Sequence, residues 1–249
     1  HPAQYLFKDA GDRMSLAQDP DAIVGMMDAH GVQAALVAVN PRKPEGALRM
    51  FEKYPTRFIG EVGVDPNAGM KSVRELEATV NLHPNIVAAS AAPCLLNPQV
   101  PIDDRRFYPI YAKCCELGLP FACTVGVPGP RIPMGPQKVE LIDEVCWFFP
   151  ELKFVMRHGG EPWCDLAVKL MLKYKNLYYM TSGFAPKYYP KAIIDYANSR
   201  GADKIIYGGY FPMGLSIERI MSDMQDLPLK DEVWPKFLRD NARKVLRLD

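Results

Sequence analysis

Short apolar runs of the kind found in β-strands alternate with amphipathic helical segments along almost the whole chain. The strand candidates are residues 34–40, 58–65, 86–93, 120–126, 153–158, 177–182 and 204–209. Helical patterns cover residues 21–30, 44–54, 72–82, 107–117, 136–149, 163–174, 188–200, 216–224 and 230–246. Parallel strands of one sheet need a crossover connection, which is usually a helix. The alternation therefore predicts an α/β chain with a parallel sheet.

The predicted repeat is one strand short of an eight-stranded barrel. The helix at residues 21–30 precedes the first visible strand, whereas the helix of a βα unit follows a strand. We therefore predict a (β/α)8 TIM barrel whose first strand lies upstream of His1. An open doubly wound sheet is the alternative interpretation, although no GxGxxG motif follows a strand. The chain has 249 residues and no linker, so we expect one barrel domain, residues 1–249.

Charge and cysteine usage narrow the class of partner. The chain has 30 basic and 29 acidic residues and a net charge of +1. Without a basic run, nothing indicates nucleic acid or an anionic membrane as a partner, and no apolar run reaches the roughly 18 residues of a membrane helix. Six cysteines without a CxxC pair are typical of reduced core residues in a cytoplasmic protein. We expect a small-molecule substrate as the partner, and the 48% hydrophobic content permits a homodimer.

One of the four histidines, His158, ends a strand pattern in the segment KFVMRHGGEPW, residues 153–163. The carboxyl ends of strands carry the chemistry in parallel β/α proteins. Phe154 and Met156 alternate in step with His158, so we predict that the imidazole continues an inward row of side chains. The glycine pair after His158 permits a sharp turn. A packed core histidine is the alternative interpretation, but the position before two glycines favours function.

Other polar or aromatic side chains at the same expected face are candidate site residues. Tyr210 would point inward and donate a hydrogen bond to a carbonyl or enolate oxygen, or would only line the pocket wall. The candidate substrate-binding residues are Asn40, Asp65, Thr124, Arg131, Glu161, Trp163 and Ser182. Arg131 would hold a carboxylate bidentately, or would be a solvated loop residue. Glu61 shares a strand face with Asp65, and that face either points into the barrel mouth or pairs with helix cations.

Five segments resemble successive landmarks of the amidohydrolase superfamily, in the branch of the aminocarboxymuconate-semialdehyde decarboxylases. They are ELGLPFACTVG, KFVMRHGGEPW, NLYYMTSG, DKIIYGGYFP and DNARKVLRL. The resemblance extends over about Leu117 to Asp249 and covers the first hundred residues only in outline. The resemblance implies a barrel that hydrolyses or decarboxylates small, often cyclic, carboxylated molecules. It also implies that His158 corresponds to a histidine that acts on the substrate more than on a metal.

The chain departs from the metal-binding pattern that the resemblance implies. Family members hold a divalent metal with a His-x-His pair on the first strand, a histidine on the fifth and an aspartate on the eighth. Here Thr124 stands at the fifth-strand position and Tyr210 at the eighth. A neutral hydroxyl and a phenol with a pKa near ~10 are poor replacements around Zn²⁺. We therefore expect no catalytic metal and no other cofactor.

Two classes of function remain open from the sequence. The first is a metal-independent hydrolase or carbon–carbon lyase, with His158 as the acid/base residue and Tyr210 assisting it. The second is a non-catalytic barrel that serves as a binding or partner subunit of an enzyme assembly. A metal enzyme with relocated ligands is a third hypothesis.

Overall fold

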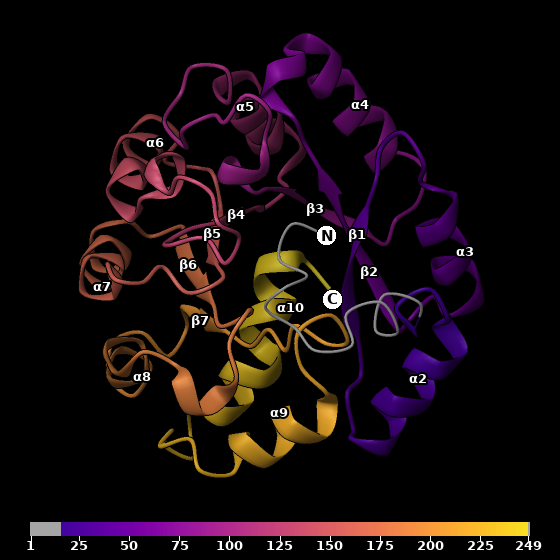
Figure 1. Ribbon diagram of the computed structural model, residues 1–249, viewed down its shortest axis with the longest axis vertical. Helices are drawn as coiled ribbons and strands as arrows, with labels where there is room; N and C mark the ends of the chain where they lie inside the picture. Colours follow the sequence, from indigo (N-terminus) through magenta and orange to yellow (C-terminus); the bar gives the residue numbers. More distant parts are fainter. Residues whose placement is uncertain (1–15, 249) are drawn as a thin grey trace.

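The computed structural model describes residues 16–248, and its centre is a curled parallel sheet (Figure 1). Seven strands follow one another in chain order from β1 to β7, and each pairs in parallel with the next. They are β1 (Ala35–Val39), β2 (Phe58–Gly63), β3 (Ile86–Ala91), β4 (Phe121–Thr124), β5 (Phe154–Arg157), β6 (Leu177–Met180) and β7 (Ile205–Ile206). The predicted α/β barrel class and all seven strand positions are confirmed. The strand predicted upstream of His1 lies outside the described residues.

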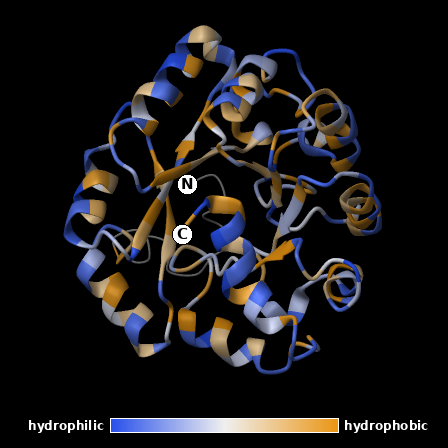
Figure 2. Cartoon of the chain, turned by 180° about the vertical axis from the view of Figure 1, so that it is seen from behind, coloured by the Kyte–Doolittle hydropathy of each residue, from blue (hydrophilic) through white to orange (hydrophobic). Residues whose placement is uncertain are grey.

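The helices lie around the outside of the curled sheet (Figure 1), and all but the first and the last of them connect consecutive strands. They are α2 (Pro20–Ala29), α3 (Glu45–Lys53), α4 (Met70–Val80), α5 (Tyr108–Leu117), α6 (Ile142–Phe148), α7 (Cys164–Lys173), α8 (Lys191–Ala197) and α9 (Ile217–Met224). Hydrophilic and hydrophobic stretches alternate along these helices (Figure 2), as expected for elements with one face on a core and one in water. None of the described helices is long and apolar enough to cross a membrane.

Three predicted helices are shorter or more broken than the sequence pattern indicates, and prolines explain two of the breaks. The segment 188–200 begins with a 3₁₀ turn, η6 (Pro186–Tyr188), and α8 starts only after Pro190. The last predicted helix, 230–246, is a π-helical turn, η7 (Lys236–Asp240), that continues into α10 (Asn241–Leu246). Proline lacks an N–H group, so Pro190 and Pro235 are tolerated only at or near a helix start. Two short 3₁₀ turns precede α6 in the segment 136–149.

The two faces of the sheet contact different parts of the molecule. Phe154 and Met156 of β5 belong to the large core between the sheet and the outer helices. Val155 belongs to a smaller cluster inside the curl, together with Ala122, Tyr178, Met180, Ile206 and Val245. Alternation along the strand then places Arg157 on the inner face with Val155. The prediction that Phe154 and Met156 mark the inward row was therefore wrong, because that row faces the helices.

Helix α10 lies near the centre of the ring in Figure 1 and covers the amino-terminal ends of the strands. Val245 packs on the inner cluster, and its carbonyl oxygen accepts a hydrogen bond from Lys153, just before β5, at 3.5 Å. Asn241 donates hydrogen bonds to the carbonyl oxygens of Ala202 and Ile205, both at 2.8 Å. The carboxyl ends of the strands, where His158 and Tyr210 follow, lie on the opposite side.

Candidate active site

The backbone at His158 leaves the strand in a conformation that side chains rarely adopt. Strand β5 ends at Arg157, and His158 has φ of 64°, followed by positive φ at Gly159 and Gly160. Only three non-glycine residues in the described part have positive φ, and two of them are His158 and Tyr210. Such conformations cost roughly 1–3 kcal/mol each and gather at functional sites, where the surrounding structure holds them.

Hydrogen bonds from neighbouring segments hold the turn after β5 in place. The Tyr179 hydroxyl, which is buried in the outer core, donates to the carbonyl oxygen of Gly159 at 2.5 Å. The backbone N–H of Gly160 donates to the Val125 carbonyl oxygen at 3.3 Å, and that of Val125 donates to the Arg157 carbonyl oxygen at 3.1 Å. These bonds link the ends of β4, β5 and β6, so the position of the imidazole is fixed by three strands.

The imidazole of His158 lies between Ser182 and Tyr210. Its Nδ1 is 3.1 Å from the Ser182 hydroxyl oxygen, and Ser182 is buried just beyond β6. The Tyr210 ring packs edge to face on the imidazole, with ring centroids 4.9 Å apart and an interplanar angle of 74°. The structure therefore brings together three residues that the sequence analysis named separately.

Two glycines permit this close approach. A Cβ atom on Gly183 would lie 3.1 Å from His158 Nδ1, and Gly183 has φ of 94°. A Cβ atom on Gly208 would lie 2.8 Å from Met180 Cγ and 3.0 Å from Ser182 Cβ. The loop beyond β7 can therefore run against the end of β6 and carry Tyr210 to the histidine.

The surroundings keep His158 uncharged. Burial lowers the pKa of the imidazole to about 3, and the positive charge of Arg157 acts in the same direction, while a hydrogen bond with the Ser182 backbone opposes them. Burial raises the pKa of Tyr210, against a smaller opposite effect of Arg157. At neutral pH the site therefore presents a neutral imidazole beside a protonated phenol.

A charged pair inside the curl is the main feature that sequence reasoning missed. Arg157 Nη1 donates to Glu61 Oε1, which joins β5 to β2 across the inner face. The exposed fractions of the two side chains are 16% and 8%. The inward interpretation of Glu61 is therefore the correct one. The sequence signal for Arg157 is a cation directly after the apolar run Phe154–Met156 and directly before His158.

Thr124 ends β4 and is half-buried on the inner face, where it pairs in register with Arg157. The other predicted binding residues have local or structural contacts. Asn40 is exposed and accepts the Arg42 N–H at 2.9 Å, and Asp65 accepts the Asn67 N–H at 3.0 Å at the start of a 3₁₀ turn.

The predicted residues on the loops around β5 do not gather at the imidazole. Arg131 and Glu161 are exposed, and the Glu161 carbonyl oxygen accepts the Val127 N–H at 2.8 Å. Trp163 precedes α7 and packs against the core between the sheet and the helices. Its predicted role as a pocket wall is not supported by this contact, because the core lies on the outer face of the sheet.

Among residues 16–248, the side chains around His158 form a poor donor set for a divalent cation. The inner face offers the Thr124 hydroxyl and the Arg157 guanidinium, which already pairs with the Glu61 carboxylate, and the loop beyond β7 offers a phenol. Zn²⁺ prefers thiolate, imidazole and carboxylate ligands, and a guanidinium repels any cation. Within residues 16–248, no three His, Cys, Asp or Glu residues cluster closely enough to hold a metal ion.

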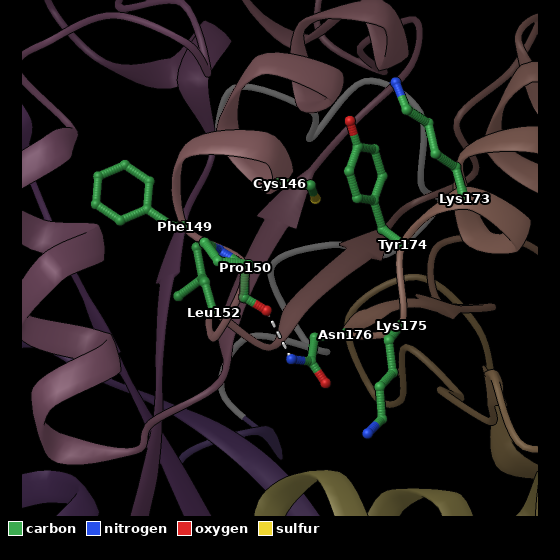
Figure 3. A pocket seen from close by; sticks show the side chains of 8 residues that line it. All are labelled: Cys146, Phe149, Pro150, Leu152, Lys173, Tyr174, Lys175 and Asn176. Carbon is green, nitrogen blue, oxygen red and sulfur yellow. Dashed lines mark hydrogen bonds between the residues drawn. The ribbon is translucent and has the colours of Figure 1, made fainter.

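Two surface hollows lie away from the imidazole. A hollow of 130 Å³ opens where the chain enters β5 and β6, at the opposite end of the strands from His158 (Figure 3). Asn176 donates to the Pro150 carbonyl oxygen there at 2.8 Å. A second hollow lies on the loop between β3 and α5, beside Asp103 and Asp104. Neither hollow includes His158 or Tyr210.

The family model described as amidohydrolase matches residues 1–248, and the chain belongs to this family. No curated protein sequence matches the chain. An uncharacterized TIM-barrel protein from Bordetella bronchiseptica is 24% identical, with 99% of this chain and 88% of that chain covered and a TM-score of 0.80.

Two enzymes have the same fold at lower identity. A 2,6-dihydroxybenzoate decarboxylase from Rhizobium is 19% identical, with 92% and 88% of the chains covered and a TM-score of 0.69. A 4-oxalomesaconate hydratase from Rhodopseudomonas palustris is 18% identical, with 96% and 91% covered and a TM-score of 0.66. At this level of identity, the two neighbours show the fold that the chain shares with enzymes of different activity.

Proposed function

We propose that the chain is a metal-independent enzyme that hydrolyses, or cleaves a carbon–carbon bond in, a small cyclic or carboxylated molecule. His158 is the proton-transferring residue in this proposal, and Tyr210 is the hydrogen-bond donor. The contact between these two side chains at the carboxyl ends of β5 and β7 carries the proposal. The substrates named for the structural neighbours, 2,6-dihydroxybenzoate and 4-oxalomesaconate, support this class of molecule.

The electrostatics around His158 suit a residue that becomes basic only when the substrate is bound. A pKa of about 3 makes His158 a weak base, because burial and Arg157 both disfavour its charged form. A substrate carboxylate beside the imidazole would offset the Arg157 charge and stabilise the imidazolium, which raises the pKa toward the working pH. The Tyr210 hydroxyl would donate to the oxygen on which negative charge develops.

Turnover assays of single variants test this function. Candidate substrates are hydroxybenzoates and unsaturated oxo-dicarboxylates, with carbon dioxide release and ultraviolet absorbance as readouts. His158→Asn should lower kcat by roughly 10²- to 10⁴-fold. Asparagine tolerates positive φ better than most residues, so this variant should keep the backbone. Tyr210→Phe should lower kcat by a smaller factor.

His30→Asn is the matched control, because His30 lies at the end of α2, on the outside of the sheet, and its imidazole is 3.7 Å from the exposed Glu218 carboxylate. It should retain the wild-type rate. Turnover by His158→Asn at the wild-type rate would remove the enzyme mechanism proposed here. The hypothesis of a binding or partner subunit would then take its place.

A further inference from the structure

The buried pair of Arg157 and Glu61 is incompletely satisfied. One guanidinium nitrogen donates to Glu61 Oε1, but Arg157 Nε and Glu61 Oε2 are both buried without a hydrogen-bond partner in the described part of the chain. A guanidinium has five N–H donors, and an ionised carboxylate can accept several hydrogen bonds. Leaving such groups unpaired in a buried site is costly. This arrangement therefore has capacity for one more polar partner.

The position of the guanidinium indicates what that partner is. Arg157 is the last residue of β5 and lies on the inner face, directly before His158. Its charge acts on His158 and on Tyr210, whose rings contact each other with centroids 4.9 Å apart. A planar guanidinium suits the two oxygens of a carboxylate, which it binds through paired hydrogen bonds. The inner face itself contributes mostly apolar neighbours, such as Val155 and Met180.

We infer that Arg157 binds the carboxylate of an organic anion at the barrel mouth and that Glu61 is the positioning residue for its guanidinium. The anion is a small carboxylate with an apolar body, since the inner cluster offers apolar contacts beside the charge. The inference rests on the proposed function in one respect, namely that this anion is the substrate of His158. Binding itself requires no reaction.

Calorimetric titration at neutral pH tests the inference, with benzoate as the probe and neutral benzamide as its matched control. The wild-type protein should bind benzoate more tightly than benzamide. Arg157→Gln should weaken benzoate binding by about 10- to 100-fold, the effect of losing a hydrogen bond to a charged group. Glu61→Gln removes a negative charge near the anion, so benzoate should bind as tightly as in the wild type or more tightly.

A purely structural pair would give a different pattern, in which both variants lose benzoate to the same extent. That result, or equal affinity of the wild type for benzoate and benzamide, would overturn the inference. Should Arg157→Gln fail to fold, the double variant Glu61→Leu with Arg157→Met keeps the volume without the charges. It should fold and bind benzoate at least tenfold more weakly than the wild type. Wild-type affinity in this double variant would also overturn the inference.

His158→Asn separates this inference from the proposed function. It should still bind benzoate, because Arg157 and Glu61 remain. Wild-type turnover in His158→Asn together with Arg157-dependent benzoate binding would refute the proposed mechanism and leave the carboxylate site standing. Loss of turnover in His158→Asn, with no effect of Arg157→Gln on benzoate binding, would refute the carboxylate site and leave the proposed mechanism standing.

Discussion

The phenol ring of Tyr210 lies edge-on against the imidazole of His158, and both residues have positive φ. Each is held by contacts to the end of β6, through the Ser182 hydroxyl on one side and the close approach of Gly208 on the other. The strained backbone and the ring contact therefore belong to one arrangement. Substitutions of His158 and of the neighbouring Gly183 test whether the two features depend on each other.

Acid should destabilise the wild-type protein more than the His158→Asn variant. The pKa of His158 is about 3 in the folded protein, against 6.5 as its ordinary value, chiefly because the imidazole is buried. Between these two pH values the unfolded chain binds the extra proton, so the free energy of unfolding falls as the pH falls. The slope should differ between the two proteins by at most about 1.4 kcal/mol per pH unit. Urea unfolding at pH 7, 6 and 5 measures this, and parallel slopes would contradict an imidazole that stays neutral in the folded protein.

Gly183→Ala should displace the imidazole as well as strain the backbone. The added Cβ atom would lie 3.1 Å from His158 Nδ1 at a residue with φ of 94°. The backbone term alone should cost roughly 1–2 kcal/mol of unfolding free energy. Gly31→Ala is the matched control, because Gly31 has φ of 67° but a Cβ atom there meets nothing within 4 Å. Only Gly183→Ala should shift the imidazole ¹⁵N resonances, and an unchanged spectrum would show that the ring has room.

The Arg157 and Glu61 pair should show strong non-additivity in stability. Removing one partner leaves a buried charge and should cost about 3–5 kcal/mol, whereas replacing both by apolar side chains of similar size should cost far less. A double-mutant cycle measures this: the free energy of unfolding is determined by chemical unfolding for the wild type, Glu61→Leu, Arg157→Met and the double variant. The same cycle on the exposed ion pair of Lys191 and Asp195 is the control. The coupling free energy between those two residues should stay below about 1 kcal/mol. Simple additivity at the buried pair would indicate that solvent already reaches both charges.

Chelation should leave the protein and its activity unchanged. Thr124, Arg157 and Tyr210 form a poor donor set for a divalent cation, so we expect no stoichiometric Zn²⁺, Mn²⁺ or Fe²⁺ after mild dialysis. Metal analysis and thermal unfolding with and without a chelator measure this. One equivalent of tightly held metal, with loss of activity or a lower Tm on chelation, would contradict metal independence.

The order of strands could be predicted because each strand is a short apolar run bounded by turn residues, a local property of the sequence. The sequence does not predict which face of each strand points into the barrel and which points to the helices. In β5 the alternation of Phe154, Met156 and His158 looks continuous, but positive φ at His158 interrupts it, and the row of Phe154 and Met156 faces the helices. Only the glycine pair hints at this interruption.

Contacts between distant strands were equally hidden from sequence reasoning. The Ser182 and Tyr210 positions were predicted at strand ends, yet their meeting at one imidazole depends on the close approach that Gly183 and Gly208 allow. The link from Arg157 to Glu61 depends on the curl of the whole sheet, since β5 and β2 are not neighbours. No local pattern encodes such a contact.

The positive φ at His158 turns the backbone, so that the charged Arg157 side chain and the neutral His158 side chain both lie at the mouth of the barrel. In a regular strand, Arg157 and His158 would point to opposite faces, and only one of them would reach the interior. Here two consecutive residues supply a permanent cation and a neutral imidazole to the same site. Inserting or deleting one residue in β5 would send the cation to the helix side, so the length of this strand is itself part of the chemical specificity.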